Sequence, residues 1–162
     1  MRTSIYISGP PCSGKSTVAL AIRQVNSVIE HIQGDDWWNS YPELPFPDRV
    51  AITNRHILHA LNQSTSNSIM CEWVPCGSFV SDMYETSVRG NRRFLHVILT
   101  APHSVLKQRK LLRDGDQDLG PATAEAEIAD IPYSVMRFCT DSCHISTIVD
   151  DICEWLRDEP LP

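Results

Sequence analysis

The feature that most constrains the fold is the segment Gly9-Pro10-Pro11-Cys12-Ser13-Gly14-Lys15-Ser16. It matches the phosphate-binding pattern G-x-x-x-x-G-K-[ST] at every fixed position. A β-rich run at residues 5–8 precedes the segment, and a run with helical spacing at residues 15–22 follows it. The order of strand, glycine-rich turn and helix is the order that this pattern requires. We therefore expect backbone N–H groups and a helix N-terminus to surround a phosphate chain here.

Strand and helix patterns alternate along the rest of the chain. We predict strands at residues 28–32, 68–73 and 94–100, and helices at 48–62, 102–113 and 122–129. Leu111 and Leu112 are expected on the apolar side of the helix at 102–113. Alternation of this kind predicts an α/β fold, a three-layer α/β/α arrangement around a parallel sheet of about five strands.

Two local signals refine these boundaries. The prolines at positions 42, 45 and 47 predict that no helix begins before residue 48. Near the end of the chain, residues 143–146 are expected to form a short last strand, and Thr147 with Asp150 resembles a capping box at the start of a final helix. The apolar side chains Ile148, Ile152, Trp155 and Leu156 fit the buried face of that helix.

Length and charge limit the classes of partner. With 162 residues, the chain is expected to form one domain over residues 1–162. Its formal net charge is −6 and it has no run of basic residues, so nucleic acid is not an expected partner. No apolar run is long enough to span a membrane, and residues 1–16 lack the apolar core of a secretory signal. We therefore expect a cytoplasmic protein without a membrane partner, whose six cysteines are free thiols.

The loop residues have expected roles in binding ATP and Mg²⁺. Lys15 is expected to bridge the β- and γ-phosphates and so to act in catalysis, and the Ser16 hydroxyl is expected to hold Mg²⁺. ATP and Mg²⁺ are therefore the predicted cofactors. The residues predicted to bind the nucleotide from this segment are Gly9, Pro10, Pro11, Cys12, Ser13, Gly14, Lys15, Ser16 and Thr17.

In this loop and in the order of its elements, the chain resembles the adenylate-kinase-like group of small P-loop kinases, which includes nicotinamide riboside kinase, gluconate kinase and shikimate kinase. The resemblance implies the P-loop nucleoside triphosphate hydrolase fold, with an acceptor-binding insert at about 37–62 and a short lid at about 107–125. It also implies transfer of the γ-phosphate of Mg-ATP to a hydroxyl of a small nucleoside-like or sugar-like acceptor.

Two carboxylates follow the second predicted strand. Asp35 and Asp36 lie at the edge where open α/β sheets bind ligands. With Trp37 and Trp38 they resemble the Q-D-D-F-F segment of nicotinamide riboside kinase. The resemblance implies that Asp36 accepts the proton of the acceptor hydroxyl, that Asp35 lies near Mg²⁺ and that Trp37 contacts the acceptor. Which of the two carboxylates is the base stays open.

Other candidate residues come from later elements. Glu72 follows the apolar run at residues 68–71, where P-loop folds carry an acid that binds Mg²⁺ through water, although the glycine that usually follows it is absent. The resemblance also implies that Arg113 stabilises the transferring phosphoryl group and that Arg109 lies beside adenine. Trp73 and Arg55 are expected to border the acceptor, Arg55 as a partner for an anionic acceptor.

Two other classes of nucleotide-binding protein compete with the kinase interpretation. A GTPase-like switch would carry D-x-x-G after the third strand and a guanine-specificity segment on a late strand, whereas Glu72 is followed by Trp-Val-Pro. A P-loop ATPase or nucleotide-binding regulatory module without a phosphoryl acceptor remains the alternative.

Overall fold

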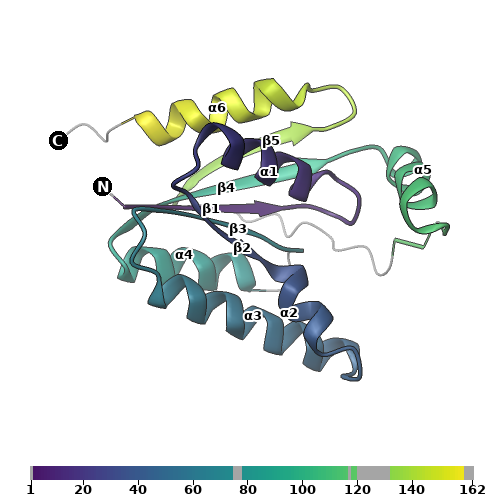
Figure 1. Cartoon of the computed structure of the whole chain (residues 1–162), viewed down its shortest axis with the longest axis horizontal. Coiled ribbons are helices and arrows are strands. Elements are labelled where there is room, and N and C mark those ends of the chain that lie inside the picture. The colour runs from purple at the N-terminus through teal and green to yellow at the C-terminus, as the bar shows by residue number, and fades with distance from the viewer. Residues whose placement is uncertain (1, 75–77, 117, 120–131, 159–162) are drawn as a thin grey trace.

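The computed structural model of this chain describes residues 2–74, 78–116, 118–119 and 132–158. Its strands β1 (Arg2–Ser8), β2 (Glu30–Gln33), β3 (Ser68–Glu72), β4 (Arg92–Thr100) and β5 (Ser134–Cys139) form one sheet in the order β2-β3-β1-β4-β5. Every pair of neighbouring strands is parallel (Figure 1). The glycine-rich loop follows the central strand, so it lies at the middle of the sheet's carboxyl edge.

Helices cover both faces of this sheet. They are α1 (Lys15–Val25), α2 (Gly34–Ser40), α3 (Phe46–Gln63), α4 (Phe79–Arg89), α5 (His103–Asp114) and α6 (Ile145–Arg157). In Figure 1, α1 and α6 lie on one face, α3 and α4 lie on the other, and α5 projects beyond the carboxyl ends of the strands. The predicted three-layer α/β/α fold is confirmed. None of the helices in the described ranges is both long enough and apolar enough to cross a membrane.

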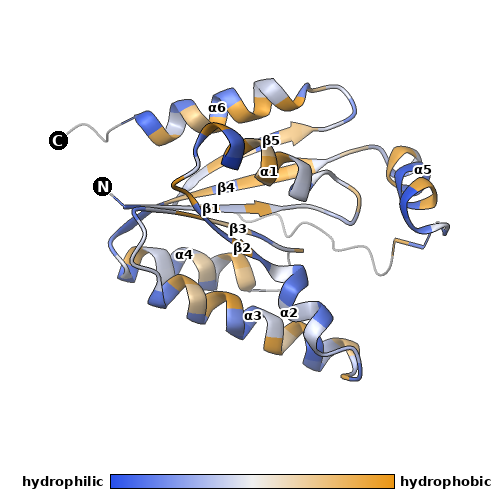
Figure 2. Cartoon of the chain, in the orientation of Figure 1, coloured by the Kyte–Doolittle hydropathy of each residue, from blue (hydrophilic) through white to orange (hydrophobic). Residues whose placement is uncertain are grey.

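The core has two parts because the sheet is buried on both faces. Successive side chains of β1 alternate between them: Ile5 and Ile7 face α1 and α6, and Tyr6 faces α3 and α4. All three side chains are at most 1% exposed. Apolar residues line the strands and the inner sides of the helices (Figure 2). Each buried aliphatic side chain stabilises the fold by about 1.5–3 kcal/mol relative to an exposed one.

The predicted end of the sheet was wrong. The last strand is β5 at Ser134–Cys139, whereas residues 145 and 146 already belong to α6. β5 lies at the sheet edge, is only partly buried and has Arg137 in its middle, so it carries no continuous apolar run. Because α6 begins at Ile145 with His144 as its N-cap, Thr147 and Asp150 lie inside the helix and form no capping box. The predicted buried face of this helix is confirmed at Ile148, Ile152 and Trp155, and Leu156 packs against it partly buried.

Two helix predictions need correction. α3 begins at Phe46, ahead of the expected start, because Pro47 occupies the first turn, where the N–H that proline lacks has no partner in the helix. In α5 only Leu106 is buried, whereas Leu111 and Leu112 are 44% and 80% exposed. These two leucines extend past the sheet and have no core to pack against. The helix predicted at 122–129 lies outside the described residues.

Candidate active site

The loop after β1 bends sharply and needs glycine at both ends. Gly9 and Gly14 have φ values of 146° and 95°, and Cys12 between them has a φ of 64°. A Cβ atom added to Gly9 would lie 2.3 Å from the carbonyl oxygen of Leu99 on the neighbouring strand β4. Only glycine therefore allows the loop to approach the sheet this closely. The backbone N–H of Ser13 donates to the Pro10 carbonyl at 3.2 Å, which closes the turn.

Lys15 lies over this loop at the start of α1. Its Nζ donates to the carbonyl oxygens of Gly9 at 3.0 Å and Pro10 at 3.1 Å. Burial lowers the pKa of the Lys15 amine, although the nearby carboxylates Asp35 and Glu72 act in the opposite direction. No side chain caps the N-terminus of α1, so its first N–H groups are available for an anionic ligand. The loop, the lysine and the helix end together form a phosphate-binding geometry.

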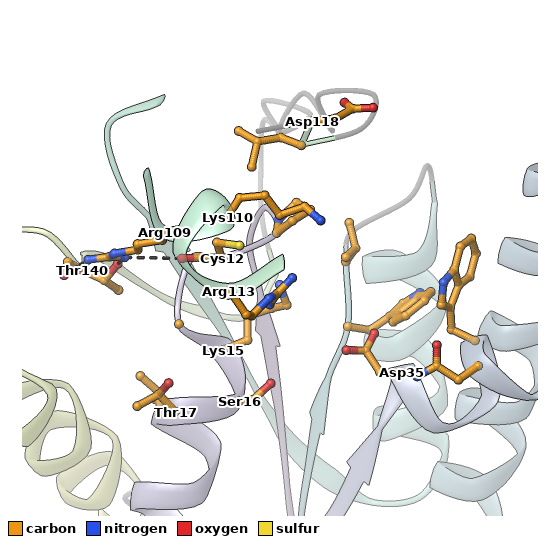
Figure 3. Close-up of a pocket in the computed structure, with 18 of the residues that line it drawn as sticks. Cys12, Lys15, Ser16, Thr17, Asp35, Arg109, Lys110, Arg113, Asp118 and Thr140 are labelled. Atoms are coloured by element: carbon orange, nitrogen blue, oxygen red, sulfur yellow. Dashed lines mark hydrogen bonds between the residues drawn. The ribbon is translucent and has the colours of Figure 1, made fainter. Parts of the chain in front are cut away.

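A cavity of about 920 Å³ opens above the loop. Its walls come from the loop, α2, the start of α3, the end of β3, α5 and the turn after β5. Figure 3 shows Arg109 and Thr140 at one end of the cavity, Asp35 at the other, and Lys15 and Arg113 between them. The cavity therefore has a basic end over the loop and α5, and a second end beside α2.

Arg109 ties the basic end together. Its guanidinium donates to the Oγ1 of Thr140 at 2.8 Å, to the backbone oxygen of Thr140 at 2.9 Å and to the carbonyl oxygen of Cys12 at 3.4 Å. One side chain of α5 thus links the phosphate loop to the turn after β5. The predicted position of Arg109 beside adenine stays a prediction.

Acidic neighbours pair with Lys110 and Arg113 of α5. The Nε of Arg113 lies 2.7 Å from the Oδ1 of Asp114, and Lys110 contacts Asp114 and Asp116 at 2.5 and 3.5 Å. Hydrogen bonds from Arg113 and Lys110 hold the pKa of Asp114 well below its ordinary value. Both basic residues also line the cavity. The Arg113 side chain is 62% exposed, so it is free to move toward a bound anion at little cost in packing.

Oxygen-bearing side chains gather below Lys15. Ser16, Asp35 and Glu72 line a smaller cavity of about 90 Å³ together with Lys15, Gln33 and Trp73. In the described ranges, no three His, Cys, Asp or Glu side chains come together as a metal site. The potential metal ligands are therefore two carboxylates and a hydroxyl, which are the hard oxygen donors that Mg²⁺ prefers.

The pKa values of the two carboxylates are shifted in opposite directions. Burial raises the pKa of Glu72, but hydrogen bonds from His31, Ser16 and Gln33 outweigh burial and leave the pKa below its ordinary value. The Nε2 of Gln33 donates to Glu72 Oε1 at 3.2 Å, and the Nε2 of His31 lies 3.2 Å from the same oxygen. For Asp35, burial raises the pKa more than the charge of Lys15 lowers it. Glu72 is thus held as an anion, whereas Asp35 is the better proton acceptor of the two.

The structure does not bring Asp36 or Trp37 to the cavity. Asp36 is exposed, and the Trp37 ring stacks on His56 with centroids 5.9 Å apart. Instead Asp35, Trp38 and Asn39 line the cavity, because residues three and four apart share one face of α2. If residues 34–40 had been predicted as a helix, the spacing of three and four residues would have placed Asp35, Trp38 and Asn39 on one face.

Trp73 lies in the wall, as predicted, but Arg55 does not. Trp73 is 4% exposed and its Nε1 donates to Asn54 Oδ1 at 2.9 Å. Arg55 lines a separate, open cavity of about 610 Å³ with residues of α3 and α4. The physical reason is helix phase: Thr53 and Ile57 point into the core, and Arg55 lies midway between them on the outer side of α3.

Several wall residues were not predicted from the sequence. Among them are Phe46, Val50, Val74, Thr140 and Ile145. Thr140 follows β5 at the carboxyl edge of the sheet, so correct assignment of that strand would have identified it.

Comparisons with known proteins agree with this geometry. A family model described as an AAA domain matches residues 5–130. No curated protein matches the sequence.

Among solved structures, a sugar kinase from Janibacter sp. HTCC2649 is 17% identical with a TM-score of 0.70, over 96% of this chain and 95% of that one. A gluconokinase from Sinorhizobium meliloti 1021 is 18% identical with a TM-score of 0.63, over 96% and 97%. The APS kinase CysC of Mycobacterium tuberculosis, in complex with AMPPNP and APS, is 15% identical with a TM-score of 0.70, over 97% and 98%. At these identities the likeness shows the fold, which is that of P-loop kinases.

Proposed function

This chain belongs to the AAA domain family, and from that premise we propose that it transfers the γ-phosphate of ATP to a hydroxyl group of a small metabolite. The observation that carries the proposal is the placement of Lys15, Arg113 and Asp35 around one cavity. In the proposal, the two cations offset the charge of the transferring phosphoryl group, and the carboxylate accepts the proton of the acceptor hydroxyl. A nucleotide-binding module without an acceptor has no need of the second end of this cavity.

The basic end of the cavity suits ATP. The loop N–H groups and Lys15 hold the phosphates, and Thr17, Arg109, Thr140 and Ile145 form the wall beyond them. Arg109 keeps this wall in place through its bonds to Thr140. The APS kinase neighbour, of the same fold, is in complex with the ATP analogue AMPPNP.

Ser16 and Glu72 are the residues that would hold Mg²⁺, and the Asp35 carboxylate lies beside them in the same small cavity. The bound ion supplies positive charge that offsets the charge of the β- and γ-phosphate oxygens. The hydrogen bond from Gln33 and the nearby His31 ring, 3.2 Å away, favour the anionic form of the Glu72 carboxylate.

Asp35 is our candidate for the catalytic base, in place of Asp36. In the proposed step, the acceptor hydroxyl gives its proton to the Asp35 carboxylate while its oxygen bonds to the γ-phosphorus. The bond from that phosphorus to the β,γ-bridging oxygen breaks, and ADP leaves. Arg113 stabilises the charge on the transferring group after exchanging its contact with Asp114 for the phosphoryl oxygens.

The test is ATP consumption with and without a library of hydroxylated metabolites. We expect at least one acceptor to stimulate ADP formation and to appear as a phosphate ester. Asp35→Asn is expected to lower the stimulated rate by about 10²–10⁴-fold, the usual contribution of a general base. Asp36→Asn is the matched control, with the same chemistry one residue away, and is expected to retain the rate.

The competing outcomes are distinct. ATP hydrolysis that no acceptor changes, and that Asp35→Asn leaves intact, would favour the ATPase or regulatory module. A rate that falls with Asp36→Asn alone would restore Asp36 as the base. If Lys15→Ala binds AMPPNP as tightly as the parent protein does, the assignment of the phosphate loop is itself wrong.

A further inference from the structure

We infer that the acceptor is an uncharged compound with an aromatic ring, rather than an anionic metabolite. The inference rests on the proposed function and concerns the end of the cavity beside α2. Three properties of that end carry it: the composition of the wall, the way the wall is held in place, and the location of every cation in the chain.

The wall at this end is apolar and aromatic. Trp38, Phe46, Val50, Trp73 and Val74 line it, from α2, α3 and the segment after β3. The Trp38 ring lies 5.7 Å from the ring of Trp73 and 5.7 Å from that of Phe46, measured between centroids. Aromatic walls of this kind bury flat apolar rings and favour edge or offset contacts with them.

The tryptophans of this wall are fixed before any ligand arrives. Trp73 is anchored by its bond to Asn54 and by close contact with Gly34. Trp38 has the guanidinium of Arg49 3.8 Å from its ring centroid, and the same guanidinium donates to the Trp38 carbonyl at 2.6 Å. Binding of a ring acceptor therefore costs little side-chain conformational entropy, and this improves its affinity.

The cations of the chain lie elsewhere. All 14 Lys and Arg residues fall within the described ranges, so every one of them is placed. Four of them line the cavity: Lys15 from the loop, and Arg109, Lys110 and Arg113 from α5. At the end beside α2 the charged wall residue is Asp35, and Arg49 is engaged with Trp38 outside the wall.

An anionic acceptor is therefore disfavoured at this end. Binding would remove water from the anionic group and place it against an apolar wall that has no cation to pair with it. The group would also be repelled by the Asp35 carboxylate. A neutral acceptor avoids both costs, and the polar groups of Asp35 and Asn39 remain for its hydroxyl. The geometry thus assigns the ring to the aromatic wall and the reacting hydroxyl to Asp35.

A direct test uses three probes on the AMPPNP-bound full chain, with binding followed by saturation-transfer NMR. The probes are 1,4-benzenedimethanol, which is neutral and aromatic, 4-(hydroxymethyl)benzoate, its anionic counterpart, and glycerol, which is neutral without a ring. For a ten-atom probe we expect a Kd on the order of a few millimolar. We expect the benzoate and glycerol to bind at least about tenfold more weakly.

Variants of α2 sharpen this test. Trp38→Leu is expected to weaken binding of 1,4-benzenedimethanol about tenfold, whereas Trp37→Leu, one residue away and outside the wall, is expected to leave it unchanged. Asn39→Arg places a cation at an exposed wall position and is expected to strengthen benzoate binding about tenfold. Unchanged AMPPNP affinity in each variant shows that the fold is intact.

Binding and transfer fail in different ways. Benzoate or glycerol binding as tightly as 1,4-benzenedimethanol, or no binding by any probe, would overturn the inference whatever the catalytic result. Preferential binding of the neutral ring, combined with no phosphate transfer to any acceptor in the metabolite library, would show that the cavity selects a neutral aromatic ligand and would reject the kinase function.

Discussion

Gly34→Ala is expected to destabilise the protein through one contact. A Cβ atom at this position would lie 2.2 Å from Cε3 and 2.5 Å from Cδ2 of the Trp73 ring. Carbon atoms in ordinary contact lie about 3.5–4.0 Å apart, so the ring would have to retreat by more than about 1 Å. Trp73 is 4% exposed and packed in the core against residues of α3 and α4, so the ring can move only toward the cavity that it lines, and it loses core contacts when it does.

The size of the effect follows from the contacts that would be disturbed. Overpacking a filled core costs about 1–3 kcal/mol. Moving the ring also strains its hydrogen bond to Asn54, which is worth about 1 kcal/mol. Alanine regains a few tenths of a kcal/mol through its helix preference at the first residue of α2. We therefore expect the free energy of unfolding to fall by about 2–3 kcal/mol.

Urea unfolding followed by far-UV circular dichroism measures this change. Gly90→Ala is the matched control, because a Cβ atom there lies 3.4 Å from its nearest neighbour, the Ser87 carbonyl oxygen, and its change is expected to stay within about 0.5 kcal/mol. Combining Gly34→Ala with Trp73→Leu should cost less than the two single changes added together, by about 1 kcal/mol or more. A Gly34→Ala protein as stable as the parent would refute the reasoning.

Three further predictions concern single side chains. Burial and nearby Arg137 lower the pKa of His96 to about 4, below the unfolded value of 6.5, so its contribution to stability is complete above about pH 6.5 and is lost as the pH falls toward 4. The unfolding free energy should therefore drop between pH 7.5 and pH 5 by about 2 kcal/mol more in the parent than in His96→Gln, and equal drops would contradict this. Arg109→Lys removes the forked contact with Thr140 and should raise the Kd for AMPPNP about tenfold in calorimetry, while Lys107→Ala should not. Glu72→Gln should raise the Mg²⁺ concentration for half-maximal AMPPNP binding about tenfold, with binding in the absence of Mg²⁺ unchanged.

The fold was largely predictable because its strongest signals are local. The run from Ile5 to Ile22 contains a strand, two glycines at positive φ and a helix, and each part depends on its neighbours in sequence. β3 and β4 are buried on both faces, so they appear as continuous apolar runs. β5 was missed because an edge strand with Arg137 in its middle has no such run.

The cavity wall was harder to predict because it depends on helix phase. α2 is short, has no side-chain cap and contains Trp, Asn and Ser, which are poor helix formers, so packing rather than propensity specifies it. Without that helix, adjacent residues such as Asp35 and Asp36 look equivalent in the sequence. The helix separates them, bringing Asp35 to the cavity and leaving Asp36 outside it.

The bridge made by Arg109 also joins segments that leave the ribosome at different times. Cys12 and the phosphate loop are synthesised first. Thr140, which accepts a hydrogen bond from the same Arg109 side chain as Cys12 does, is synthesised more than a hundred residues later. The apolar face of α1 likewise waits for α6 to cover it. A nascent chain that carries the whole loop therefore still lacks one wall of its nucleotide site. The wall over the phosphate loop is therefore built from segments that lie far apart in the sequence.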